Sequence, residues 1–276
     1  MSLLAASRSE LTKQFTTAGW WILAIVLVVY VGSSAGGLAG FFSALATGAL
    51  TDEAQTGSID DASLARLVYS LAASLGYVFP LLVGTLAATA EFRYETLTPT
   101  FLATPRRGVA LTAKALVGIV MGLLFAVVAV VSVVLPGAAL IASFGLDPAL
   151  GSGDTWALLG RAVLALVIWA LVGIGLGTLV RNQVVAIVVV LAFTQFVEPI
   201  LRLAGGFVDV LSAVTNFLPG AASDALVGMS IFNSMGQGGP ASADPLEWWA
   251  GGLVLGGYTL VFLVLGYLLS WRRDVT

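Results

Sequence analysis

The sequence predicts an all-α membrane protein that crosses the bilayer six times. Of its 276 residues, 59% are hydrophobic and only 10% are charged, and the mean hydropathy is +1.01. A soluble domain of this length does not need so much apolar content. Apolar runs long enough to cross a hydrocarbon core of about 30 Å recur along the chain. The polar segments between them are alternately rich in basic and in acidic residues, as expected on the two sides of a membrane.

Six spans are predicted, and their approximate ranges are residues 19–42, 65–90, 109–143, 156–180, 184–205 and 246–271. Glycines spaced by four predict seams of close helix contact in the first and fourth spans. These glycines are Gly32, Gly36, Gly40, Gly173 and Gly177. Pro80 predicts a kink in the second span, and Pro136-Gly137 predicts a bend in the third.

Residues 1–18 are expected to form a separate element before the six-span domain of residues 19–276. Within residues 3–18, one helical face carries the apolar side chains Leu4, Leu11, Phe15 and Ala18. This pattern predicts an amphipathic helix that lies in the inner membrane interface. The alternative is a disordered basic N-terminus.

The distribution of charge predicts that both termini lie in the cytoplasm. An even number of spans places the termini on one side of the membrane. With the N-terminus inside, nine of the 12 basic residues fall in inner segments and 11 of the 15 acids fall in outer ones. The positive-inside rule favours this orientation.

The segment from Glu91 to Arg107, EFRYETLTPTFLATPRR, is the densest charged and turn-forming stretch between two spans. Lipid cannot satisfy its charges, so it must lie in water or against a partner protein. Threonine caps, Pro99 at a first helical position and a stop at Pro105 predict a short helix on the cytoplasmic surface. The alternative is an ordinary positively charged loop without a partner.

This segment resembles the coupling-helix region of type-2 ABC transporter permeases, and the span layout is similar over essentially the whole chain. The residues that match are Glu91, Phe92, Arg93, Thr96, Phe101, Leu102, Pro105 and Arg107. Many members of that family have glycine before the threonine, where this chain has Glu95. The resemblance implies a set of residues that couple to an ATPase: Glu91, Phe92, Arg93, Glu95, Thr96, Thr100, Phe101, Leu102, Pro105, Arg106 and Arg107.

Residues 206–248 contain two apolar stretches, on either side of Pro219-Gly220, that are each too short to cross a bilayer. A re-entrant helical hairpin between the fifth and sixth spans is therefore predicted. The permeases that this chain resembles carry such helices, with a Leu-Pro pair at the break, and the corresponding residues are Leu218, Pro219 and Gly220. A glycine-rich loop is expected at residues 233–245.

In the resembled family, the second and fifth spans face each other across a two-fold dimer and line the transport path. The residues that this nominates are Tyr77, Phe79, Thr85, Phe193, Gln195, Phe196 and Glu198. For each of them, ordinary packing is the alternative. Glu198 and Arg202 are one helical turn apart and can pair, or can contact the predicted hairpin.

The sequence predicts no catalytic site, metal site or cofactor in this chain. It has no cysteine and no histidine, and it has no GxxxxGKS or GxxxxGKT phosphate loop. The resemblance implies that two separate ATPase subunits bind ATP and magnesium. It also implies a second permease, either another copy or a relative, and contact with membrane lipids but not nucleic acid.

The expected function is therefore the membrane-spanning part of an ABC exporter in a bacterial plasma membrane, and the composition favours an actinobacterium. A hydrophobic or amphipathic drug, peptide antibiotic or lipid-like compound is the expected cargo, as in multidrug efflux. One alternative is a stand-alone carrier or channel, which the scarcity of charges in the spans disfavours. Another is a membrane anchor or immunity subunit that recruits an ATPase without transport.

Overall fold

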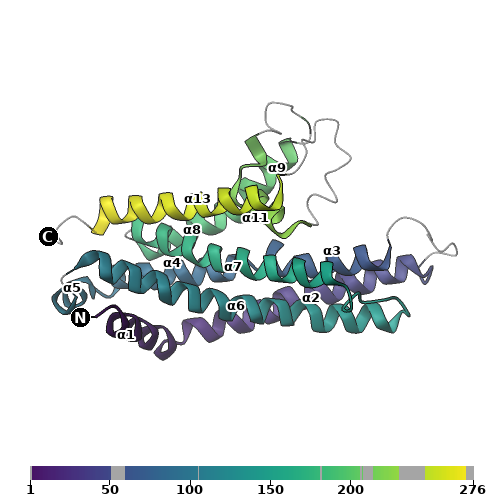
Figure 1. The fold of residues 1–276 in the computed structure, drawn as a ribbon, viewed down its shortest axis with the longest axis horizontal. Coiled ribbons are helices and arrows are strands. Elements are labelled where there is room, and N and C mark those ends of the chain that lie inside the picture. The colour runs from purple at the N-terminus through teal and green to yellow at the C-terminus, as the bar shows by residue number, and fades with distance from the viewer. Residues whose placement is uncertain are drawn as a thin grey trace.

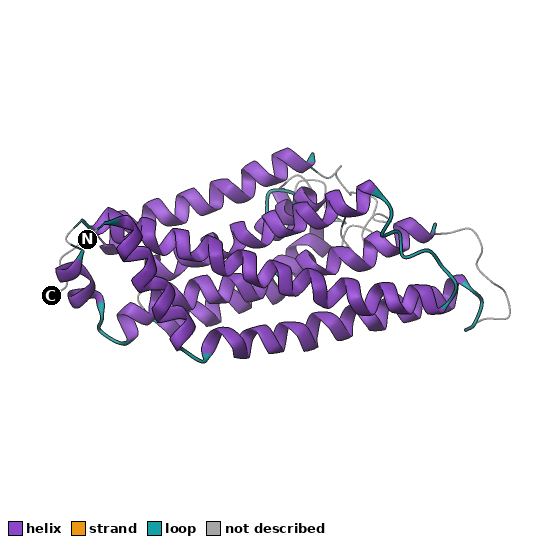
Figure 2. Ribbon diagram, turned by 60° about the horizontal axis from the view of Figure 1, so that its bottom comes forward, coloured by secondary structure: helices purple, strands orange, loops and turns teal. Residues whose placement is uncertain are grey.

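The computed structural model describes residues 2–50, 60–104, 106–180, 182–205, 207, 214–229 and 246–271. Within these ranges the chain forms helices and loops but no β-strand (Figure 2). Six helical segments are long and apolar enough to cross a membrane: Gly19–Ala46, Asp61–Arg93, Arg107–Ser143, Gly153–Leu179, Gln183–Gly205 and Trp248–Leu269. Each predicted span falls on one of these segments, so the expectation of an all-α chain with six such helices is confirmed.

The spans form an elongated antiparallel bundle (Figure 1). The elements are α1 (Leu3–Thr16), α2 (Gly19–Ala46), α3 (Asp61–Ser74), α4 (Val78–Arg93), α5 (Leu97–Ala103), α6 (Arg107–Ser143), α7 (Gly153–Leu179), α8 (Gln183–Ala192), the π-helical η1 (Phe193–Val197), α9 (Glu198–Gly205), α11 (Pro219–Val227), α13 (Trp248–Gly266) and the π-helical η2 (Tyr267–Trp271). Helices α1 and α5 lie at one end of the bundle, on the left of Figure 1, which we call the α5 end. We call the opposite end, where α3 begins, the far end.

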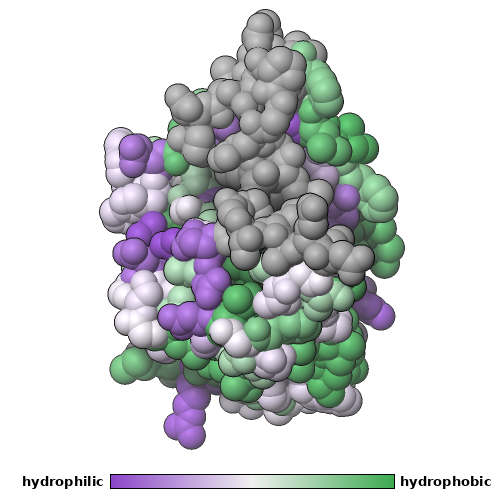
Figure 3. Space-filling model, turned by 90° about the vertical axis from the view of Figure 1, so that its right-hand side faces the viewer, coloured by the Kyte–Doolittle hydropathy of each residue, from purple (hydrophilic) through white to green (hydrophobic). Residues whose placement is uncertain are grey.

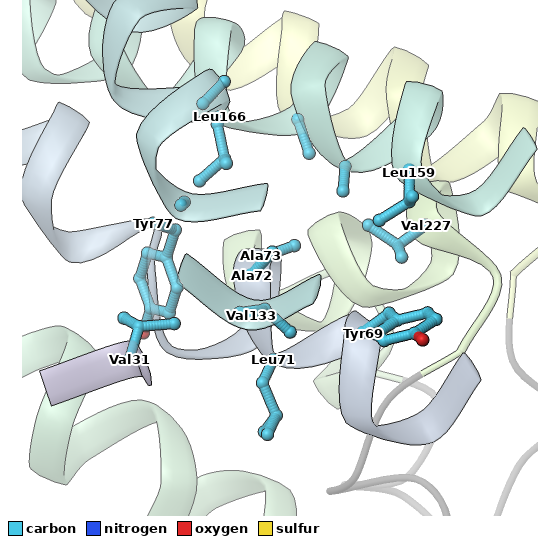
Figure 4. Close-up of a cluster of buried hydrophobic side chains, with 14 of the residues drawn as sticks. Val31, Tyr69, Leu71, Ala72, Ala73, Tyr77, Val133, Leu159, Leu166 and Val227 are labelled. Carbon is cyan, nitrogen blue, oxygen red and sulfur yellow. The ribbon is translucent and has the colours of Figure 1, made fainter. Parts of the chain in front are cut away.

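The second span, α3 and α4 together, is the centre of the bundle. In its most apolar window, 78% of the residues are buried, against 22% for the fifth span and 17% for the sixth. Figure 4 shows the core from inside, with Tyr69, Leu71 and Tyr77 of the second span among side chains of four other elements. The fifth and sixth spans therefore leave most of their apolar surface outside the core.

A seam of small residues brings α4 and α7 into backbone contact. A β-carbon added to Gly173 of α7 would overlap the carbonyl oxygen of Leu81, and one added to Gly84 of α4 would overlap that of Ala170. At Gly177 an added β-carbon would lie 2.6 Å from the Thr85 carbonyl oxygen. The seam predicted in the fourth span is therefore confirmed, and its partner is the second span.

The glycine seam of the first span lies against α6. An added β-carbon at Gly32 would be 3.2 Å from the Ser132 carbonyl oxygen, and one at Gly36 would be 3.5 Å from the Leu140 side chain. At Gly40 the nearest such contact is 4.0 Å. The predicted close approach is therefore tightest at Gly32.

The second span is interrupted at Leu75–Tyr77, in the turn that precedes Pro80, where the proline predicted a kink. Helix α3 ends at Ser74 and α4 begins at Val78. Pro80 is the third residue of α4, where its missing N–H removes no hydrogen bond within that helix. The proline therefore suits the start of a new helix after the break.

Two further prolines lie within helices, one in the interior and one at the start. Pro136 lies inside α6, which is assigned as one helix through that position. Pro219 is the first residue of α11, with Leu218 as its N-cap. The loop predicted at residues 233–245 lies outside the described residues.

In Figure 3, which looks onto the far end, hydrophilic residues gather on one side and hydrophobic residues dominate the other.

Candidate functional site

A tight turn joins the second span to α5. Glu95 has φ +53°, in the left-handed region that favours glycine, and the N–H of Thr96 donates to the carbonyl oxygen of Glu91 at 3.0 Å. Glu95 occupies the position at which the resembled permeases often have glycine. The turn therefore has the shape that glycine would favour, although a glutamate forms it.

We expect Glu95→Gly to stabilise the protein by about 0.5–1 kcal/mol. A residue other than glycine pays about 1–2 kcal/mol for this conformation, and the added freedom of glycine in the unfolded chain offsets part of the gain. Thermal unfolding in detergent would measure the change. Ala90→Gly, within α4, is the control and should destabilise, because its helical backbone gains nothing from glycine.

Helix α5 carries an exposed apolar side chain at the end of the bundle. The side chain of Leu102 is exposed, with 78% of the residue accessible, whereas Phe101 is half-buried under the Arg107 guanidinium, 5.1 Å from the ring centroid. Thr100 Oγ1 donates to the Thr96 carbonyl oxygen at 2.8 Å. The helix is thus stabilised by the Thr100–Thr96 hydrogen bond and by the contact of Phe101 with Arg107 of α6. Its Leu102 side is exposed.

The other predicted coupling residues surround α5. Arg93 donates to Gln183 Oε1 of the fifth span at 3.2 Å and lies over the Tyr94 ring. Phe92 is half-buried, and Arg106 is exposed. Pro105 lies outside the described residues. Among the coupling residues that the structure describes, Glu91 alone is buried.

Four charged residues meet beneath α5, and we call them the charge cluster: Glu10 and Lys13 of α1, Glu91 of α4 and Lys114 of α6. Lys114 Nζ lies 2.6 Å from Glu10 Oε2 and 3.4 Å from Glu91 Oε1. Lys13 Nζ lies 3.2 Å from the same Glu91 oxygen. Two acids and two bases balance, so the cluster avoids an uncompensated buried charge.

The burial of the charge cluster was not predicted from sequence. Lys114 and Glu91 are each 3% exposed and Glu10 is 7% exposed, although Glu10 lies off the apolar face predicted for residues 3–18. A signal was present, because Lys114 is an isolated lysine inside an apolar span, and such residues are usually paired. Its partners could not be named, because they come from elements 23 to 104 residues away.

A second polar group lies between α3, α9 and α11, and we call it the α11 network. Asp224 of α11 accepts from Arg202 Nη2 at 2.7 Å and from Ser74 Oγ, at the end of α3, at 3.0 Å. Glu198 Oε1 accepts from the N–H of Ala221, in the first turn of α11, at 3.0 Å. Glu198 and Arg202 therefore both contact the segment after Pro219, as the sequence allowed.

The break in the second span meets the π-helical segment of the fifth. Tyr77, in the break, donates from its hydroxyl to the Thr194 carbonyl oxygen at 3.2 Å, and its ring lies 4.6 Å from that of Trp169. Trp169 Nε1 donates to Ser223 Oγ of α11 at 3.0 Å. π-Helical turns are frequent at functional sites, so the contact of these two irregular segments marks the mid-bundle region as a candidate site.

The residues nominated for a transport path do not share one surface of the chain. Tyr77, Phe79, Thr85 and Glu198 are buried in its interior. On the fifth span, Phe193 is half-buried, whereas Gln195 and Phe196 are exposed. The second span is too central within the single chain to present these side chains outward together with those of the fifth.

No protein-family model matches the chain, and a search of curated proteins finds no match. Among the residues that the structure describes, no group of three or more acidic, histidine or cysteine side chains is placed to hold a metal ion. The case for a function therefore depends on the motif around α5 and on the geometry of the two polar groups.

Proposed function

We propose that this chain is the membrane-spanning subunit of an ATP-driven ABC exporter, and that α5 is the coupling helix that docks on a separate ATPase. The observation that carries the proposal is the exposed Leu102 at the tip of a short helix between the second and third spans. Burying a leucine side chain in a groove of a partner would stabilise the complex by about 1.5–3 kcal/mol. Membrane lipid is not the expected cover, because charged side chains surround this tip.

The contacts of α5 suit the transmission of force. It follows directly from α4, the second helix of the most buried span, and leads into α6 through Arg106. The stacking of Arg107 on Phe101 ties the helix to α6. A push on α5 from an ATPase would therefore reach the centre of the bundle through α4.

The rest of the assembly follows from this assignment. The α5 end would face the cytoplasm of a bacterium, with both termini on that side, and two ATPase subunits would bind ATP and magnesium there. The exposed apolar face of the fifth span, which includes Val184, Val188 and Ile200, would meet lipid or a second permease, either a copy or a relative. The segment with α11 would be the re-entrant hairpin, and the cargo would be hydrophobic or amphipathic.

One observation favours a stand-alone carrier as the second candidate. Glu198 and Asp224 are 2% and 3% exposed, and ion-coupled carriers place such buried acids on their paths. Reconstitution into vesicles without an ATPase separates the two candidates. Uptake or release of an amphipathic dye that follows an imposed proton gradient in those vesicles would support the carrier.

We expect Leu102→Asp to reduce the amount of ATPase that co-purifies with this chain by at least tenfold. A carboxylate in an apolar groove loses the burial of leucine and adds a desolvation penalty. The partner used would be a candidate ATP-binding-cassette ATPase from the same organism. Pull-down of the two purified proteins, followed by ATPase assay, provides the measurement.

Leu50→Asp is the matched control. Leu50 is 57% exposed and follows α2, which starts at the α5 end and runs to the far end. The control should bind ATPase as wild type does. Equal binding by Leu102→Asp and wild type would contradict the assignment of α5 as the coupling helix.

A further inference from the structure

Lys13 lies where α1 meets the two elements beneath the proposed coupling surface. Its ammonium group contacts Glu91 at the end of α4, and it donates to Thr100 Oγ1 of α5 at 3.5 Å. The third contact is to Glu10, one turn earlier in α1. One side chain of the N-terminal helix therefore touches both the last turn of the second span and α5.

The attachment of α1 to the bundle combines the charge cluster with apolar contacts of Ala6 and Leu11. Within α1, only Ala6 and Glu10 are buried. Leu4 and Phe15, which belong to the predicted apolar face, are 84% and 42% exposed. Leu4 and Phe15 thus point away from the protein, where a membrane interface would cover them, whereas Leu11 of the same face packs against the core.

Lys114 anchors this attachment to the spans. It donates to Glu10 Oε2 at 2.6 Å and to the Ala87 carbonyl oxygen of α4 at 3.1 Å. Because Lys114 is 3% exposed, these contacts are shielded from water and are stronger than surface ion pairs. Lys13, in contrast, has a side chain that is 42% exposed and can change without opening the core.

The charges of α1 match this arrangement at neutral pH. Burial by itself would raise the pKa of Glu10, but the ammonium groups of Lys114 and Lys13 lower it below its ordinary value. Burial would likewise lower the pKa of Lys13, but Glu10 and Glu91 raise it above its ordinary value. Glu10 therefore stabilises the folded protein fully at pH values above the ordinary glutamate pKa. This stabilisation is lost as the pH falls through the lowered pKa of Glu10 in the folded protein. The stabilisation of the folded protein by Lys13 is lost only as the pH rises through the raised pKa of Lys13.

We propose that α1 is a positioning element for α5, in which Lys114 fixes Glu10 and Lys13 transmits the position of α1 to Glu91 and Thr100. This inference rests on the proposed coupling role of α5 only for its functional consequence. Its structural content, that Lys13 restrains α5 against α1, can be tested without an ATPase. If the inference holds, a shift of α1 in the membrane interface moves the surface that an ATPase would contact.

The test is pulsed electron paramagnetic resonance, which measures the distance between two spin labels. The full chain is placed in phosphatidylcholine–phosphatidylglycerol nanodiscs for this measurement. The chain has no cysteine, so introduced pairs are labelled specifically. Labels at Thr16→Cys and Pro99→Cys report the distance from α1 to α5, and labels at Thr16→Cys and Thr112→Cys report the distance from α1 to α6. All three positions are exposed.

In the Lys13→Met variant we expect the distribution of α1–α5 label distances to broaden or to gain a second population. The distribution of α1–α6 label distances should stay narrow. Lys114→Met should broaden both, because the anchor itself is lost. Lys13→Arg should retain the wild-type distributions. An unchanged α1–α5 distribution in Lys13→Met, or a change that appears only together with α1–α6 broadening, would overturn the proposal.

Binding of the ATPase then separates this inference from the proposed function. When α5 is out of place in a fraction of the chains, apparent affinity falls in proportion, so Lys13→Met should bind roughly threefold more weakly. If wild type binds no ATPase but the distances change as expected, the proposed function fails and the positioning role stands. If wild type binds and Lys13→Met changes neither distance nor affinity, only the positioning role fails.

Discussion

Gly173→Ala is expected to reduce the stability of the fold by about 3 kcal/mol, at the upper end of the cost of overpacking a close interface. The added methyl group would overlap the carbonyl oxygen of Leu81, and it would lie 3.0 Å from the backbone nitrogen of Thr85. Both are backbone atoms, which cannot rotate away as a flexible side chain could. Helices α4 and α7 would therefore have to separate, and α4 belongs to the most buried span.

Gly160→Ala is the matched control for this prediction. Gly160 lies in the same helix, α7, and an added β-carbon there meets no atom within 4 Å. The control should be neutral or slightly stabilising, because alanine favours a helix more than glycine does. Folded yield by size-exclusion chromatography and thermal unfolding in detergent would compare the two. Similar unfolding temperatures for both variants would show that α4 and α7 do not approach as closely as the structure indicates.

Asp224→Asn is expected to destabilise the protein by about 3–5 kcal/mol. The substitution removes the charge that pairs with Arg202 at 2.7 Å, where the side chains of Asp224 and Arg202 are only 4% and 15% exposed. Breaking a buried pair from one side loses its attraction while the other charge stays away from water, and this is the main source of the loss. The α11 segment should become sensitive to protease before the rest of the chain unfolds, because the same carboxylate holds Ser74.

Asp154→Asn is the corresponding exposed change. The Asp154 side chain is 82% exposed and lies 3.7 Å from Arg66, so its loss should change stability by less than about 1 kcal/mol. A double variant, Asp224→Leu with Arg202→Met, should recover part of the stability that Asp224→Asn loses, because it removes both charges. Loss of stability in the double variant equal to that in the single one would show that the pair is not the cause.

The second span links the two polar groups of the structure. Its first helix, α3, ends at Ser74, which contacts the α11 network, and the last turn of its second helix, α4, carries Glu91 of the charge cluster. The break at Leu75–Tyr77 lies between them. A movement of α4 would act directly on the charge cluster and would reach Ser74 only across the break, so the break lies on the route between the α5 end and α11.

The six helices could be predicted from the sequence because hydropathy is a local property of each segment. The same is true of the glycine seam at Gly173 and Gly177, since a spacing of four places both residues on one helix face. A short helix after Glu91 was also expected, but its predicted start was wrong: the helix begins at Leu97, so Pro99 is its third residue, and the N-cap Thr96 makes no side-chain capping hydrogen bond. Glu95 was recognised as unusual, but its left-handed backbone was established only by the structure.

Other features depend on contacts between distant parts of the chain. The sequence showed that Lys114 is charged within an apolar span, but only the tertiary structure joined it to Glu10, 104 residues away. Likewise, Arg202 was expected to have a partner, and the structure selected Asp224. The structure also showed that the irregularity expected from Pro80 is a full break between two helices at Leu75–Tyr77. Local composition determines which segments leave water, because transfer energy is summed along each helix. Which buried charges meet is decided by helix packing, because a buried charge takes the partner that the fold brings within reach.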